Sequence, residues 1–247
     1  MTRWSRLCLL AVAWPWSLAA AQPPAPAGPA VTITLGPRHG HVTPVRQGCV
    51  HTGAGNIDVA QPAPDTIVIT MAGAAVATAQ PVKDSVATLD FDLDQALEIA
   101  VADPKVKGLK VTLEGRVIGL LRSHAGCSKK CCGTAGVSVA HAALVCEPTE
   151  LLALSLVPHS VACGENLSIN DRAGPATQTI VPGRYTFHQT FSVTASHPRS
   201  VVPCKAASAE FAPDPALDPL WISYWEPFHG AAKKDFGFQV TIKVAPE

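Results

Sequence analysis

Soft metal ligands are crowded into one stretch of this sequence. Thiolate and imidazole together suit zinc or copper(I). A structural zinc site normally contains paired Cys-x-x-Cys knuckles, however, and this stretch has none. The crowded ligands are His124, Cys127, Cys131, Cys132, His141 and Cys146. Because cysteines of exported proteins usually form disulfides, we favour disulfides here and keep zinc or copper binding by this loop as the alternative.

Beyond the N-terminal segment the cysteines number seven, which is odd, so at least one is unpaired or pairs between molecules. Residues 117–123 and 136–146 have the pattern of hairpin arms, so a bond from Cys127 to Cys131 or Cys132 would close the loop between them. Cys146 with Cys163 could tie consecutive strands. The disulfide candidates are Cys49, Cys127, Cys131, Cys132, Cys146, Cys163 and Cys204.

A second group of ligand-type residues lies near the N-terminus. His39-x-His41 is followed by Cys49-x-His51. No feature of the sequence brings this group to the cysteine loop. We therefore assign no metal ligand and no cofactor from the sequence.

Three carboxylates alternate with apolar residues at 90–94. Asp90, Asp92 and Asp94 would share one face of a strand, where hard oxygen ligands could hold calcium. A calcium-hand loop needs glycine at its sixth position and glutamate at its twelfth, which here are Gln95 and Val101. We therefore predict a solvated polar face opposite a buried apolar stripe.

The segment from 221 to 228 is rich in aromatic residues. As a strand it would place Trp221 and Trp225 on one face, and exposed indoles of that kind stack on sugar rings. Large aromatic side chains are more often buried, so we favour a core role and keep a carbohydrate or protein ligand as the alternative.

No segment carries a convincing catalytic motif. Gly136-Val137-Ser138-Val139-Ala140 is a broken form of the Gly-x-Ser-x-Gly elbow, which needs a strand–turn–helix setting that this sequence does not offer. Phosphate-cradling glycine loops and His-Glu-x-x-His are absent from the sequence. We predict a protein that is not an enzyme.

Charge argues against a nucleic-acid partner, and hydropathy argues against a membrane span after the N-terminal segment. The 19 basic and 19 acidic residues give zero net charge, and the basic residues are scattered, which argues against nucleic-acid binding. The apolar run from Leu7 to Trp14 follows Arg3 and Arg6 and is too short to span a bilayer. With Ala19 and Ala21 as small residues before the cleavage point, residues 1–21 are typical of a signal peptide. No later segment reaches membrane-spanning length.

Strand signals dominate the rest of the chain. Val31–Leu35 alternates with period two and should stop at Gly36-Pro37, and residues 87–94 alternate more clearly. Short strands punctuated by glycine and proline predict an all-β fold of antiparallel β-sandwiches, one large or two small. One short helix competes, over Asp94–Ala102, with Asp94 as its N-cap.

A shift in composition divides the chain. Residues 22–30 form a Pro/Ala-rich leader that we expect to be disordered. Beyond the leader, Phe91 is the only aromatic residue before Tyr185. We therefore predict a β domain at 31–147 and an aromatic-rich β domain at 148–247, with the boundary near Pro148.

Together these patterns predict a secreted or periplasmic, non-catalytic β-sandwich with a binding or structural role in the cell envelope or the extracellular space. The alternative is an exported metal-binding protein that uses the Cys/His-rich loop. The patterns do not identify its partner.

Export gives the first test. We expect the secreted protein to begin at or near Gln22, because cleavage should follow the small residues at 19 and 21. Sequencing the N-terminus of secreted material measures this. Material that still begins at Met1 or Thr2 would exclude the signal peptide.

Overall fold

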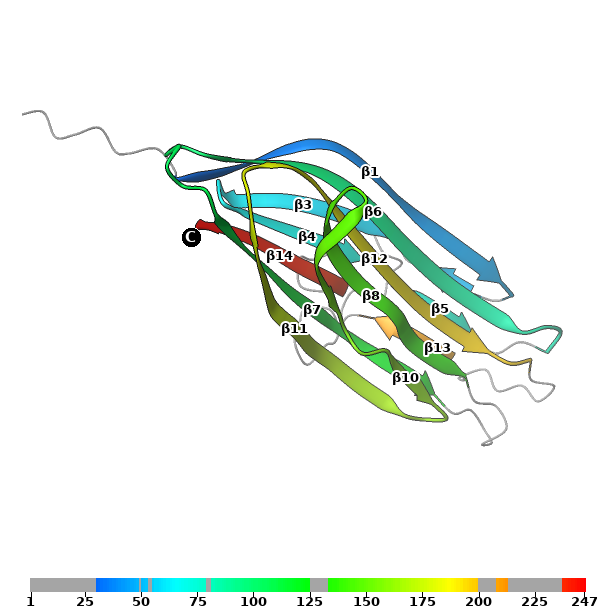
Figure 1. Cartoon of the computed structure of the whole chain (residues 1–247). Helices are drawn as coiled ribbons and strands as arrows, with labels where there is room; N and C mark the ends of the chain where they lie inside the picture. The colour runs from blue at the N-terminus through cyan, green and yellow to red at the C-terminus, as the bar shows by residue number, and fades with distance from the viewer. Residues whose placement is uncertain are drawn as a thin grey trace, which may run out of the picture.

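The computed structural model describes residues 30–48, 50–52, 55–78, 81–124, 133–199, 208–212 and 237–247. Within these ranges the regular elements are all strands, arranged in two antiparallel sheets (Figure 1). The predicted all-β, antiparallel sandwich fold is therefore confirmed. The described residues contain no helix of the length and hydropathy that crossing a membrane requires.

The first sheet has six strands. In spatial order its main path is β1 (Val31–Gln47), β6 (Ser85–Val101), β12 (Gly183–His197), β8 (Thr134–Cys146) and β10 (His159–Ala162), and β9 (Thr149–Ser155) also pairs with β8. β6 pairs along most of its length with β1 on one side and β12 on the other.

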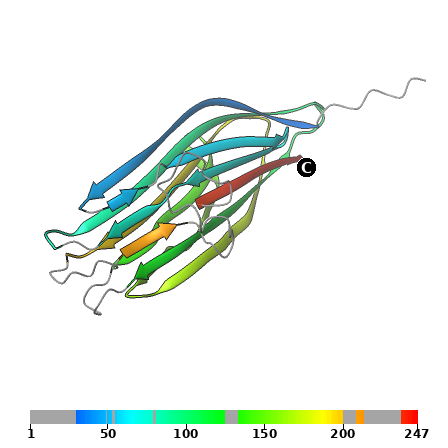
Figure 2. The ribbon, with the colours of Figure 1, turned by 180° about the vertical axis from the view of Figure 1, so that it is seen from behind.

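The second sheet has eight strands. Its path is β2 (Val50–Thr52), β5 (Ala75–Thr78), β13 (Ser208–Ala212), β7 (Leu109–His124), β14 (Gly237–Pro246), β4 (Thr66–Ala72) and β3 (Asn56–Ala63), and β11 (Asn166–Ile180) also pairs with β7. Figure 2 shows the molecule from behind, with the C-terminal strand β14 in red.

The two sheets share one hydrophobic core. The ring of Phe191 on β12 lies 5.6 Å from that of Phe91 on β6 and 5.9 Å from that of Phe238 on β14, between ring centroids. All three rings are buried. Phe238 belongs to the opposite sheet, so this cluster joins the two layers directly.

Both sheets contain strands from before and after the predicted boundary near Pro148. Pro148 lies in the turn between β8 and β9, which pair with each other. β12 pairs with β6, and β14 pairs with β4, so both sheets contain strands from before and after residue 148. The aromatic residues of β12 and β14 belong to the same hydrophobic core as Phe91.

The helix expected over Asp94–Ala102 is not present, and that prediction is wrong. β6 continues to Val101, because Leu97 and Ile99 are buried while Glu98 between them is exposed. That alternation follows a strand, and pairing with β1 and β12 supplies the backbone hydrogen bonds that a helix would have made internally.

The predicted hairpin of residues 117–123 and 136–146 is also wrong. β7 and β8 belong to different sheets. β7 pairs with β11, β13 and β14, whereas β8 pairs with β9, β10 and β12. Each strand has the right alternation, but the chain crosses between layers instead of turning back within one sheet.

β1 passes the Gly36-Pro37 position where the sequence predicted a stop. The register shifts between Leu35, which pairs with Leu97, and Arg38, which pairs with Gln95. Three steps on β1 therefore match two on β6, which is a β-bulge. Proline fits there because a bulge leaves a residue outside the hydrogen-bond ladder. The Gln95 side-chain amide donates to the Gly36 carbonyl over 2.9 Å and holds the bulge in place.

The core cluster gives a stability prediction. Phe191→Ala should lower the free energy of unfolding by about 3–5 kcal/mol, because the ring is 1 % exposed and its removal leaves a cavity between the sheets. Urea unfolding followed by circular dichroism measures this. Val157→Ala, at a side chain that is 72 % exposed, should change stability by less than about 0.5 kcal/mol. Equal costs for the two variants would contradict the shared core.

Candidate metal centre

The outer side of β6 carries the three aspartates. Leu89, Phe91 and Leu93 point into the core and are buried, while Asp90 is exposed and Asp92 and Asp94 are half-buried. The predicted polar face opposite an apolar stripe is therefore confirmed.

β12 places a histidine beside these carboxylates. His188 is directly opposite Asp94 in the register, and its Nδ1 lies 2.8 Å from Asp94 Oδ1. One pair further along, Thr190 is opposite Asp92. Side-chain exposure is 34 % for His188 and 50 % for Asp94, so the pair faces solvent without being fully hydrated.

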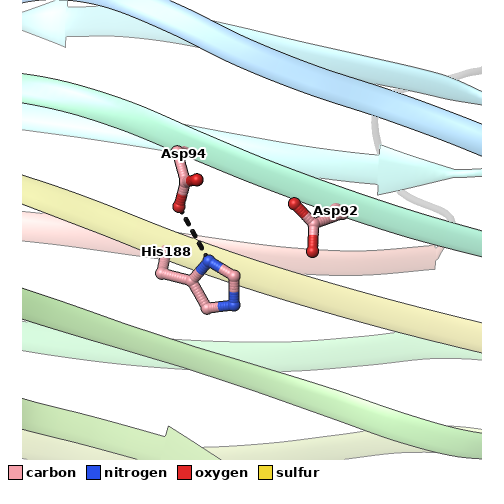
Figure 3. Close-up of side chains that lie close together, drawn as sticks. All are labelled: Asp92, Asp94 and His188. Atoms are coloured by element: carbon pink, nitrogen blue, oxygen red, sulfur yellow. Dashed lines mark hydrogen bonds and ion pairs between the residues drawn. The ribbon is translucent and has the colours of Figure 1, made fainter.

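Asp92, Asp94 and His188 form a group of metal-ligand type. Each offers one ligand atom, and these atoms all lie within 4.8 Å of one another. Figure 3 shows the Asp94 carboxylate and the His188 ring turned toward each other between neighbouring strands, with Asp92 two residues along β6. Two carboxylate oxygens and one imidazole nitrogen leave further coordination positions open to water or to other side chains.

Adjacent hydrogen bonds hold the rest of this face in order. Ser192 on β12 donates its hydroxyl to Asp90 Oδ1 over 2.6 Å. The hydroxyls of Thr88 and Thr194 lie 3.2 Å apart across the same pair of strands. Asp90 therefore has a serine hydroxyl as its partner from β12, whereas Asp94 has an imidazole. The group of metal-ligand type consists of Asp92, Asp94 and His188 and does not include Asp90.

Three further histidines flank the group on the same sheet. On β1, His39 is opposite Asp94 and His41 is opposite Asp92. On β8, His141 is opposite Thr190. His141 Nδ1 lies 2.8 Å from the Ser155 hydroxyl on β9, and its Nε2 lies 3.9 Å from a Glu150 carboxylate oxygen, so this ring is held toward β9.

The fold brings together three histidines that the sequence analysis had placed in two separate groups, namely His39, His41 and His141. His39 and His41 were set beside Cys49 and His51, and His141 beside the cysteine loop, but all three lie on the face that carries the aspartates. His188 was not singled out at all. Its only signal is its place on the polar side of the alternation from Tyr185 to Phe191, and that signal needs the strand register to become informative.

A hollow of about 560 Å³ lies next to the group, where the outer faces of β1, β6, β8 and β12 meet. Arg184, Glu98 and Glu147 give it charges of both signs. Burial raises the pKa of the Tyr185 phenol in its wall, and the charge of Cys146 adds to that rise. The phenol donates a hydrogen bond to the Val181 carbonyl.

The cysteine predictions have a mixed outcome. Cys49, Cys127, Cys131, Cys132 and Cys204 lie outside the described residues, as do the side chains of His51 and His124 and both Trp221 and Trp225. The bond proposed between Cys127 and Cys131 or Cys132 therefore stays a prediction.

The suggested bond between Cys146 and Cys163 is wrong. Cys146 is an exposed free thiol at the end of β8, whereas Cys163 is disulfide-bonded. β10 pairs with the opposite end of β8, with Ala162 opposite Thr134. At about 3.3 Å per residue the two cysteines are on the order of 40 Å apart, far beyond the reach of a disulfide.

Residues 136–140 lie inside strand β8. A nucleophile elbow needs a sharp turn between a strand and a helix, so Ser138 does not have that geometry. Its hydroxyl instead donates to the Ser192 carbonyl over 3.5 Å.

No family model, no curated protein and no solved structure matches this chain. Function is therefore argued from the residues of the site alone.

The free thiol gives a direct test of the cysteine assignment. Cys146 should react with a maleimide in the native, non-reduced protein, because its side chain is exposed. Peptide mass spectrometry locates the label, and Cys146→Ser should remove it. Recovery of Cys146 in a disulfide-linked peptide would contradict the structure at this position.

Proposed function

We propose that this chain is an exported, non-catalytic binding protein that holds a divalent cation on the outer face of its six-stranded sheet. One observation carries the proposal: the ligand atoms of Asp92, Asp94 and His188 lie within 4.8 Å of one another. Two strands far apart in sequence supply them, so the group depends on the fold.

Carboxylate repulsion alone does not require a cation here. The ligand oxygens of Asp92 and Asp94 lie within 4.8 Å of each other, and at that separation two carboxylates repel each other in water by roughly 0.9 kcal/mol. A repulsion of this size between solvent-facing carboxylates does not require a bound cation. The imidazole of His188 is what distinguishes the group from an ordinary acidic face, because it adds a nitrogen ligand beside two carboxylates.

The setting favours binding over catalysis. Metal-assisted catalysis works best in a site that is shaped and closed to water. This group lies on the side of a sheet that faces solvent, and its neighbours on β12 are threonine and serine side chains. Export of the chain to the periplasm or the extracellular space stays part of the proposal. A carbohydrate or protein ligand for Trp221 and Trp225 stays the alternative to their role in the core.

The alternative of zinc or copper binding by the Cys/His-rich loop uses different residues. Its ligands would be the thiolates and imidazoles of that loop, and the thiol reagent of the labelling experiment would block the thiolates. Asp92, Asp94 and His188 are insensitive to alkylation. The two sites can therefore be separated in one set of measurements.

Binding can be measured on the purified secreted protein after treatment with a chelator. We expect one divalent ion to bind per chain at the sheet face, by isothermal titration calorimetry. Asp94→Asn and His188→Asn should each weaken binding by about tenfold or more, because each removes a ligand. Both side chains are solvent-facing, so the fold should persist, which circular dichroism checks.

Asp58→Asn is the matched control, since Asp58 is an exposed aspartate on β3 of the other sheet. It should leave the affinity unchanged. Absence of binding to the unmodified chain would reject the proposal. Binding that survives Asp94→Asn and His188→Asn but disappears on thiol alkylation would assign the cation to the cysteine loop instead.

A further inference from the structure

Strand β1 sets a His-x-His sequence against the Asp-x-Asp of β6. His39 is paired with Asp94 and His41 with Asp92. Residues directly opposite each other in an antiparallel pair have Cβ atoms about 4.5–5.5 Å apart, within reach of an imidazole and a carboxylate. Asp94 therefore has a histidine opposite it on both neighbouring strands, His39 on β1 and His188 on β12.

The bulge in β1 is what turns these histidines outward. Val31 and Ile33 are buried and Leu35 packs against the core, so odd-numbered residues face inward at the start of the strand. Continued without a bulge, that alternation would send His39 and His41 into the core. The extra residue between Leu35 and Arg38 exchanges the two faces of the strand, so that even-numbered residues face inward beyond the bulge and odd-numbered residues face outward.

The residues beyond the bulge show that even-numbered positions of β1 now face the core. A Cβ added to Gly40 would lie 3.0 Å from Leu93 Cδ1 and 3.4 Å from Ile57 Cδ1, so this position faces the core. Val42 packs against the core as well. His39 and His41 are exposed on the same side of the sheet as Asp92 and Asp94.

We infer that His39 and His41 complete the coordination shell of the proposed site, and that its cation is a transition ion of the zinc and copper class. The inference rests on the proposed function. The ligand atoms that lie within 4.8 Å of one another are those of Asp92, Asp94 and His188, so the rings of His39 and His41 would turn toward Asp94 and Asp92 when the ion binds. Three imidazoles together with two carboxylates suit zinc, copper or nickel. Calcium takes six to eight oxygen ligands, and these side chains supply too few.

Such a site would also stabilise β1, the strand at the edge of the sheet. β1 is the terminal strand of its sheet and hydrogen-bonds to β6. A cation bound by His39, Asp94 and His188 would link β1, β6 and β12 through side chains as well. Bound metal should therefore slow amide exchange of β1 around Gly40.

Paired variants test the inference on the full secreted chain. The double variant His39→Ala/His41→Ala should weaken Zn²⁺ binding by about tenfold or more and leave the affinity for Ca²⁺ unchanged, because calcium coordinates oxygen ligands and not imidazole nitrogen. Thr43→Ala is the control on the same outer face of β1, opposite Asp90, and should bind Zn²⁺ as the unmodified chain does. Competition with a chromophoric chelator measures both ions.

Hydrogen–deuterium exchange supplies a second readout. Zn²⁺ should slow exchange at residues 38–43 in the unmodified chain and in Thr43→Ala, and should have no such effect in the double variant. Because His39 and His41 are exposed, their replacement should leave the fold intact.

The outcomes separate the two proposals. Equal Zn²⁺ affinity of the double variant and the unmodified chain, or tighter binding of Ca²⁺ than of Zn²⁺, would overturn the inference. If Asp94→Asn and His188→Asn still weakened binding in that case, the proposed function would stand. No binding of any divalent ion by the unmodified chain would overturn both.

Discussion

β6 must bury every second side chain against the opposite sheet, and the outer face of the molecule follows from that requirement. Leu89, Phe91, Leu93, Leu97 and Ile99 are all buried on its inner side. Complete burial of each side chain of this size stabilises the fold by about 1.5–3 kcal/mol. Repulsion between the carboxylates of Asp92 and Asp94 in water is roughly 0.9 kcal/mol, which is smaller than the gain from burying even one of these side chains. The carboxylates are gathered on one face because the apolar residues are gathered on the other.

The same reasoning explains how much the sequence could predict. Period-two alternation is a local property, so the strands, the all-β class and the solvated Asp90–Asp94 face could all be derived from it. Local patterns also produced the errors. Asp94–Ala102 has a good N-cap and few strand formers, but its Leu97 and Ile99 fit the sheet, and pairing on both sides of β6 outweighs a helical preference of a few tenths of a kcal/mol per residue.

Pairing between strands could not be derived from one sequence. β7 and β8 each alternate as predicted, yet they lie in different layers, and no local signal distinguishes a crossing from a hairpin. For the same reason, the group of Asp92, Asp94 and His188 could not be predicted from the sequence. His188 lies ninety-four residues from Asp94 along the chain, and only the register of β6 with β12 makes them neighbours.

Register itself needs a determinant beyond burial. A two-residue slip of β12 along β6 would keep every apolar side chain inside, but it would move His188 from Asp94 to Asp92 or Ala96. One buried amide opposes a slip of β1 along β6, and a second opposes the slip of β12. Gln95 donates to the Gly36 carbonyl of β1 over 2.9 Å, and Gln189 donates to the Phe238 carbonyl of the other sheet over 3.3 Å.

On a slip of β12 the Gln189 amide would lose the Phe238 carbonyl, and a buried polar group left without a hydrogen bond costs about 1–3 kcal/mol. On a slip of β1 the Gln95 amide would lose the Gly36 carbonyl and keep its bond to the Ala96 carbonyl, 3.0 Å away on its own strand. Gln95 directly follows Asp94, and Gln189 directly follows His188, so these two buried amides lie immediately behind the ligand group on the outer face. The inner hydrogen bonds thereby fix the alignment on which the outer group depends, and apolar burial alone would leave that alignment undetermined.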